Sequence, residues 1–120
     1  MRKEEVFALT TFVNSQTFER IVTGEQNEVL RVIYPSNKEV FITNDDGDNV
    51  EFVGYNTMKL VDIAKGRELL CNIKNVDIIT LQAEDGNVYP YVIRDKEYKP
   101  EGLIYELGNV IEIDDNDTGK

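Results

Sequence analysis

The chain has 120 residues, of which 41% are hydrophobic, and its 23 acidic and 13 basic side chains give a net charge of −10. This length allows one domain with a core, and the hydrophobic content excludes an extended disordered chain. The negative charge disfavours direct binding to nucleic acid or to an anionic membrane surface, and it favours a basic partner or simple solubility.

The sequence also lacks the usual features of membrane and secreted proteins. No stretch of apolar residues is long enough to cross a membrane. The amino terminus, MRKEEVFALTTFVN, has no long apolar region of the kind found in signal peptides. Cys71 is the single cysteine, which rules out an intrachain disulfide. We therefore expect a cytoplasmic protein.

Residues 3–23 show both helical and strand patterns. Apolar side chains recur at helical spacing in two pieces, one around Leu9 and one around Phe18. Asn14-Ser15 can cap the second piece, and Gly24 can end it. The β-branched and aromatic run VFALTTFV would also suit a strand. We expect two helical pieces that cover one side of a sheet.

From residue 28 the hydrophobic pattern changes to the period of two that is typical of strands. Three strands are expected at Glu28–Tyr34, Lys38–Asn44 and Val50–Tyr55. The turn Pro35-Ser36-Asn37 joins the first two, with its φ angle preset by proline. An acidic reversal at Asn44–Asn49 joins the next two. The sequence thus predicts a three-stranded meander.

The next segment predicts a short helix and then a strand. Over residues 57–65, Met58 and Val61 fall at helical spacing, and Lys65-Gly66 is typical of a helix end. Arg67–Ile73 is rich in apolar residues and is expected to be a strand.

The clearest pattern is the segment Val76–Arg94, which predicts a β-hairpin. Its expected strands are Val76–Ala83 and Val88–Arg94, and Glu84–Asn87 is the expected turn because it contains glycine and asparagine. Pro90 cannot donate a ladder hydrogen bond, so the returning strand is expected at a sheet edge.

The last third of the chain predicts two short strands and a tail. Leu103–Leu107 and Val110–Ile113 are the expected strands, around a reversal at Gly108-Asn109. Residues 114–120 have no apolar side chain and are expected to form a mobile acidic tail. Residues 1–113 are expected to form a single α+β domain, dominated by antiparallel β-hairpins with N-terminal helical cover. An all-β small barrel or sandwich is the alternative.

The sequence offers few groups for catalysis or metal binding. It has no histidine, so the usual base near neutral pH is missing, and Cys71 has no such base to activate it. The acidic turn around Gly47 fails the EF-hand pattern because Ile42 stands where an acid is needed. We expect no enzymatic activity, no cofactor and no metal site.

Binding to another protein is the function that this composition favours. We expect an inhibitor or adaptor that masks a basic nucleic-acid-binding surface, of the kind found among bacterial or viral accessory proteins. Acidic turns can occupy a site built for phosphates, and exposed tyrosines are common anchors at interfaces. Solvation explains the acidic turns equally well. The candidate partner-binding residues are Asp45, Asp46, Asp48, Glu84, Asp85, Tyr89, Tyr91, Tyr98, Glu112, Asp114, Asp115 and Asp117, with Tyr105 as a further possible anchor.

An alternative function remains open. The chain could be a small-ligand or ion-binding module, either monomeric or oligomeric, whose pocket the sequence does not reveal.

Overall fold

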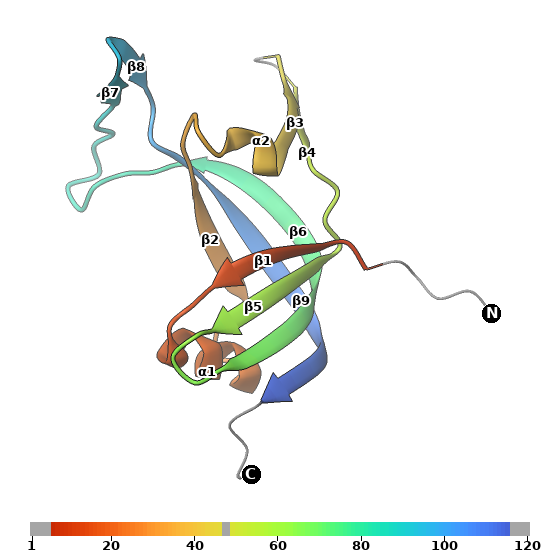
Figure 1. Ribbon diagram of the computed structural model, residues 1–120. Helices are drawn as coiled ribbons and strands as arrows, with labels where there is room; N and C mark the ends of the chain where they lie inside the picture. Colours follow the sequence, from red (N-terminus) through yellow and green to blue (C-terminus); the bar gives the residue numbers. More distant parts are fainter. Residues whose placement is uncertain (1–5, 47–48, 116–120) are drawn as a thin grey trace. The chain divides into compact units, whose positions relative to one another are not determined.

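The computed structural model of the chain describes residues 6–46 and 49–115. It is mostly β, with 54% strand and 12% helix, in antiparallel and mixed sheets (Figure 1). The α+β prediction therefore holds with only minor helical cover, and the described strands form no closed barrel. The elements are β1 (Ala8–Phe12), α1 (Ser15–Thr23), β2 (Glu28–Ile33), α2 (Lys38–Phe41), β3 (Ile42–Asp45), β4 (Val50–Phe52), β5 (Thr57–Asp62), β6 (Arg67–Thr80), β7 (Tyr91–Ile93), β8 (Lys96–Tyr98) and β9 (Glu101–Asp115).

The described residues divide into two compact units. Unit 1 lies within Met1–Val29, Gly54–Asn75 and Glu106–Lys120, and unit 2 lies within Leu30–Val53 and Val76–Tyr105. Five strands pair in the order β1-β5-β6-β9-β2, while β3-β4 and β7-β8 form separate two-stranded ladders. The long strands β6 and β9 contribute residues to both units.

The first expected helix is a strand. β1 runs parallel to β5, with Leu9 beside Met58 and Thr11 beside Leu60. Leu9 and Thr11 are buried, whereas Thr10 is exposed, so this piece follows the period of two. Its β-branched residues suit a strand, and pairing with β5 overrides the helical spacing. The helical prediction for this piece was wrong.

The second expected helix is confirmed as α1. The Asn14 side chain accepts a hydrogen bond from the Thr17 amide at 2.7 Å, which caps the helix. Gly24 ends the helix with a φ of 83°, and its amide donates to the Ile21 carbonyl. Phe18 and Ile21 are buried. Both predicted end signals therefore act as expected.

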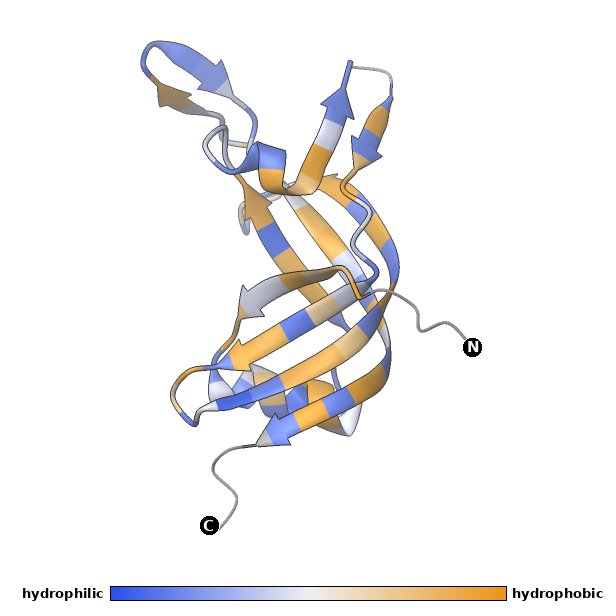
Figure 2. Cartoon of the chain, turned by 45° about the vertical axis from the view of Figure 1, so that its right-hand side comes forward, coloured by the Kyte–Doolittle hydropathy of each residue, from blue (hydrophilic) through white to orange (hydrophobic). Residues whose placement is uncertain are grey.

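The helix expected over residues 57–65 is also a strand, β5. Met58, Leu60 and Asp62 are buried, and the residues between them are more exposed. Figure 2 shows hydrophobic and hydrophilic residues interspersed along the strands of the five-stranded sheet. β5 pairs antiparallel with β6, and Gly66 lies in the turn between them with a φ of 65°. The predicted helix end is therefore the turn of a hairpin.

The reversal expected at Gly108-Asn109 is absent, because β9 runs through it without interruption. A Cβ atom at Gly108 would lie 2.9 Å from Cγ of Lys74 on the neighbouring strand. Glycine is therefore needed here for close approach within a sheet rather than for a turn. Both predicted strands are parts of β9. Within the expected tail, Asp114 and Asp115 belong to β9, and residues 116–120 lie outside the described residues.

Unit 2 departs from the predicted meander. β2 confirms the first predicted strand, but Lys38–Phe41 is a short helix and only Ile42–Asp45 is a strand. β3 pairs with β4, whereas β2 belongs to the five-stranded sheet. The turn at Pro35-Ser36-Asn37 is confirmed.

The hairpin expected over Val76–Arg94 is wrong, although its turn is present. The first strand is the end of β6, and residues 81–90 form no strand. At the predicted turn the Ala83 amide donates to the Asn87 carbonyl at 2.9 Å. The returning segment cannot pair fully because it contains Pro90. Its end, β7, pairs instead with β8 in a hairpin of three-residue strands.

A buried ion pair joins α1 to the β5–β6 hairpin. Arg67 Nε donates to Asp62 Oδ2 at 3.0 Å, and Arg67 Nη1 lies 2.8 Å from Glu19 Oε2. The guanidinium also lies over the Phe18 ring, 4.5 Å from its centroid. Ser15 Oγ donates to Asp62 Oδ1 at 3.0 Å. Asp62 is fully buried, so its contacts with Arg67 and Ser15 form away from water, whereas the Glu19 side chain is 55% exposed. Together these contacts hold the helix against both strands.

We expect Arg67→Met to lower the free energy of unfolding by about 3 kcal/mol, because it leaves a buried carboxylate without its ion pair. Urea unfolding followed by circular dichroism measures this loss. Lys74→Gln is the matched control. Lys74 is largely exposed and lies 3.8 Å from Glu106, so its loss should cost under about 1 kcal/mol. Equal losses in the two variants would contradict the role assigned to Arg67.

Asp62 should make stability depend on pH. Burial alone would raise the pKa of Asp62, but the hydrogen bonds from Ser15, Arg67 and the Lys65 amide, together with the positive charge of Arg67, outweigh it and hold the pKa below its ordinary value of 3.8. The unfolded chain therefore protonates this carboxylate at a higher pH than the folded protein does. Its contribution should be complete above pH 3.8 and lost as the pH falls through the lower folded-state pKa. Acid should therefore destabilise the wild-type protein more than the Asp62→Asn variant. If the free energies of unfolding of the two proteins fall in parallel as the pH falls, this prediction is contradicted.

Candidate functional site

α1 covers one face of the sheet of unit 1, and no helix among the described residues covers the other, which we call the open face (Figure 1). Strand register places Thr10 beside Lys59, and Lys59 beside Leu70. Phe12 and Val61 form a neighbouring pair on the same face, and Phe12 is 65% exposed. Along each strand, the residues of this face alternate with buried residues such as Leu9 and Leu60. The open face therefore carries a mixture of apolar and charged side chains.

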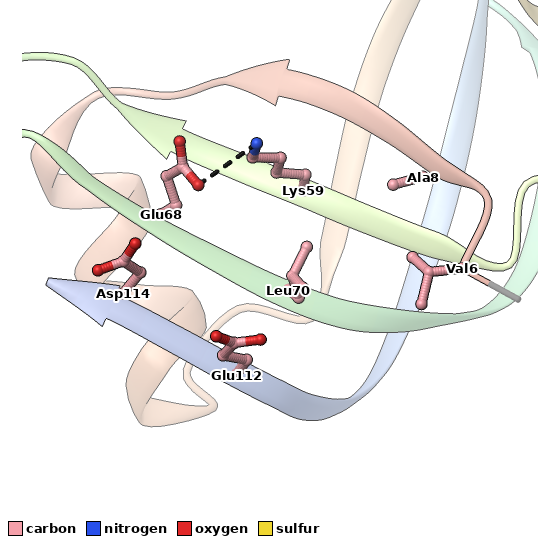
Figure 3. A pocket seen from close by; sticks show the side chains of 7 residues that line it. All are labelled: Val6, Ala8, Lys59, Glu68, Leu70, Glu112 and Asp114. Carbon is pink, nitrogen blue, oxygen red and sulfur yellow. Dashed lines mark ion pairs between the residues drawn. The ribbon is translucent and has the colours of Figure 1, made fainter. Parts of the chain in front are cut away.

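A cavity of about 340 Å³ lies on this open face. Figure 3 shows Glu68 next to Asp114 on the neighbouring strand, and Leu70 next to Glu112. They come from β6 and β9, and Lys59 extends from β5. We call this cavity the acidic groove; its lining residues are Val6, Ala8, Lys59, Glu68, Leu70, Glu112 and Asp114.

The acidic groove has an excess of negative charge. Lys59 Nζ lies 3.3 Å from Glu68 Oε1, and both side chains are more than a third exposed. Among the described residues, no cation forms an ion pair with Glu112 or Asp114. One lysine thus faces three carboxylates over an apolar floor. A lysine or arginine from a partner could pair with the carboxylates while its alkyl stem covers Leu70.

Two of the predicted acidic turns have local structural roles in unit 2. Asp45 Oδ2 lies 2.9 Å from Lys38 Nζ, and Asp46 accepts a hydrogen bond from the Asn49 amide at 3.0 Å. Asp85 accepts from the Tyr89 hydroxyl and from the Asn87 amide. The hydrogen bond from Tyr89 is the main cause that lowers the pKa of Asp85. These acids stabilise the turns in which they occur.

The predicted tyrosines have different environments. Tyr91 and Tyr98 stack, with ring centroids 5.7 Å apart, and Tyr34 meets Tyr91 edge to face at 6.2 Å. Tyr89 is exposed, whereas Tyr105 is buried in the core and cannot be a surface anchor. Sequence reasoning missed Tyr34; its position directly before Pro35, where β2 ends, was the available signal.

The tyrosine cluster lines two cavities of unit 2, with volumes of about 200 and 480 Å³. Pro35 and Tyr98 line both. We call this region the tyrosine surface; it consists of Tyr34, Pro35, Lys38, Tyr91, Arg94, Lys96, Tyr98 and Lys99.

The remaining candidates lie in different parts of the chain. Glu112 and Asp114 belong to unit 1, and Glu84 belongs to unit 2, in the turn with Asp85. Asp115 is the last residue of β9. Asp48 and Asp117 lie outside the described residues.

Other kinds of site were sought in the described residues. No group of three or more His, Cys, Asp and Glu side chains there is placed to hold a metal ion. None of the helices in that part of the chain is both long and apolar enough to span a membrane. Burial raises the pKa of the Cys71 thiol, which disfavours the nucleophilic thiolate.

Comparisons with protein-family models, with curated proteins and with solved structures find no match to this chain.

We expect Glu112→Gln with Asp114→Asn to change the free energy of unfolding by less than about 0.5 kcal/mol, because both side chains are exposed. A slight gain at low salt would reflect weaker repulsion among the carboxylates. Thermal unfolding measures the effect, and Leu60→Ala, at a fully buried position, is the destabilised control. A large loss in the double variant would assign these acids to the fold instead of a binding role.

Proposed function

We propose that this is a non-enzymatic protein that binds another protein through the acidic groove of unit 1. The observation that carries the proposal is that Glu68, Glu112 and Asp114 line one cavity together with Leu70, on the open face of the sheet. Opposite charges across an interface speed association and select the partner. Apolar contact with the floor would supply the remaining affinity. The expected partner surface presents lysine or arginine beside apolar side chains.

A basic surface of this kind is typical of proteins that bind nucleic acid. Binding of that surface to the acidic groove would mask it from nucleic acid, so the protein would act as an inhibitor or adaptor. Two observations support a non-enzymatic role. The sequence contains no histidine, and the one cysteine is buried. The expected setting is the cytoplasm, where a lone thiol remains reduced.

The proposal predicts capture of a basic protein. Immobilised protein incubated with nuclease-treated bacterial lysate should retain a basic nucleic-acid-binding protein that elutes at moderate salt, because ion pairs at the groove are screened. The variant Glu68→Gln, Glu112→Gln, Asp114→Asn should lose this retention. In a separate assay, added wild-type protein should release the purified partner from its nucleic acid.

A charge-matched variant separates the groove from net charge. Glu25→Gln, Glu39→Gln, Glu97→Gln removes the same number of carboxylates at exposed positions outside the groove and should retain the partner normally. If both triple variants lose the partner equally, binding depends on net charge alone and the groove has no specific role. If neither loses it, binding occurs elsewhere on the protein.

A small cationic ligand is the second candidate. The cavity volume of about 340 Å³ is at the lower end of the range for ligand sites. Spermidine, as a probe, should then raise the unfolding temperature of the wild-type protein and leave that of the Glu68, Glu112 and Asp114 triple variant unchanged. No shift in the wild-type protein would remove this candidate.

A further inference from the structure

The tyrosine surface of unit 2 has a chemistry opposite to that of the acidic groove. Four cations, Lys38, Arg94, Lys96 and Lys99, line its two cavities together with a single carboxylate, Glu101. Lys38 is paired with Asp45, but no ion pair to the other three cations occurs among the described residues. Cations therefore outnumber carboxylates among the residues that line these cavities, although the chain has a net charge of −10.

The aromatic rings form a platform that remains accessible. Tyr34 is 48% exposed, and Tyr91 and Tyr98 are half-buried. Lys96 Nζ lies 5.4 Å from the centroid of the Tyr98 ring, which places a cation at the edge of the platform. Burial, together with Tyr34, Glu101 and Tyr98, raises the pKa of Tyr91. Its hydroxyl therefore stays protonated and can donate a hydrogen bond to a peptide carbonyl.

The turn of the β7–β8 hairpin holds a basic side chain in an unfavourable backbone conformation. Arg94 and Asp95 have φ angles of 52° and 69°, and they form a two-residue turn between Ile93 and Lys96. Both positions of such a turn favour asparagine or glycine. Strained non-glycine residues are concentrated at ligand-binding sites. Arg94 lines the larger cavity, so we attribute its presence in the turn to binding.

We propose that the tyrosine surface binds an extended, proline-containing segment of a partner protein, flanked by acidic residues. The two cavities adjoin at Pro35 and Tyr98, so one extended segment could occupy both. Proline-rich segments adopt a preformed helix that docks on aromatic grooves at low entropic cost. Acidic flanks would pair with Arg94, Lys96 and Lys99.

This site is independent of the acidic groove, because its residues belong to unit 2 and its ligand has the opposite charge. A single nucleic acid strand also stacks on aromatic rings beside cations. The net charge of the chain would repel that polyanion over a long range, whereas a short acidic peptide carries far less charge. The observations therefore favour the peptide.

The test is a titration of the full chain with a defined peptide, followed by NMR chemical shifts. The probe has a Pro-Pro-Leu-Pro-Pro centre with two glutamates on each side. It should bind saturably and shift the signals of Tyr34, Tyr91 and Tyr98. Binding should weaken by about tenfold or more when lysines replace the glutamates or alanines replace the prolines, as it should in the Tyr34→Ala variant. The triple variant of the acidic groove should bind this peptide normally.

Two further variants distinguish binding from folding. Lys96→Glu with Lys99→Glu should reverse the preference, so that the lysine-flanked peptide binds better. Arg94→Asn with Asp95→Gly should raise the unfolding temperature, because these residues suit the turn, yet weaken binding of the glutamate-flanked peptide. Absence of saturable binding, equal binding of both peptides, or tighter binding of oligothymidylate would overturn the proposal.

Discussion

Unit 1 depends on the interactions of one buried group, the guanidinium of Arg67. It pairs with Asp62 and Glu19 and covers the ring of Phe18, so β5, β6 and α1 meet at one side chain. A buried charge with these partners tolerates little displacement, because any shift would leave a charge unpaired away from water. The helix is thereby fixed on one face of the sheet. The other face has no helical cover in the described residues, and the acidic groove lies there.

The two faces of the sheet differ because strands alternate. In β6, Leu69 and Cys71 are buried, whereas Glu68 and Leu70 line the groove. A shift of one residue in register would exchange these sets and place Glu68 in the core. The same pairing that builds the core therefore also positions the groove. Stability and binding are linked through register, although they use different side chains.

Local signals in the sequence predicted the local features of the fold. Asn14 and Gly24 marked the ends of α1, and the glycine-containing turn after Ala83 is present. The period of two predicted β2. These elements are determined by capping, turn chemistry and alternation within a few residues. The helical cover is nevertheless much smaller than expected, because β1 and β5 are strands.

The errors arose where distant pairing decides the structure. The segment around Leu9 fits a helix by spacing, but it pairs in parallel with β5, far along the chain. Gly108 resembled a turn signal because the sequence does not show the Lys74 side chain beside it. The residues of the candidate sites also depend on pairing between distant segments. Glu112 and Tyr91 could be named from composition, but only strand pairing adds Glu68, and only the fold of unit 2 adds Tyr34.

Thiol labelling of adjacent residues on β6 tests most directly whether one face of the sheet is covered and the other is open. Cys71 is 1% exposed, so in the folded wild-type protein it should react with a maleimide only after denaturant is added. In a Cys71→Ala background, a cysteine introduced by Leu70→Cys should react about tenfold faster or more, because it lies in the acidic groove. Equal rates, or faster reaction of Cys71, would show that the covered and open faces have been assigned wrongly.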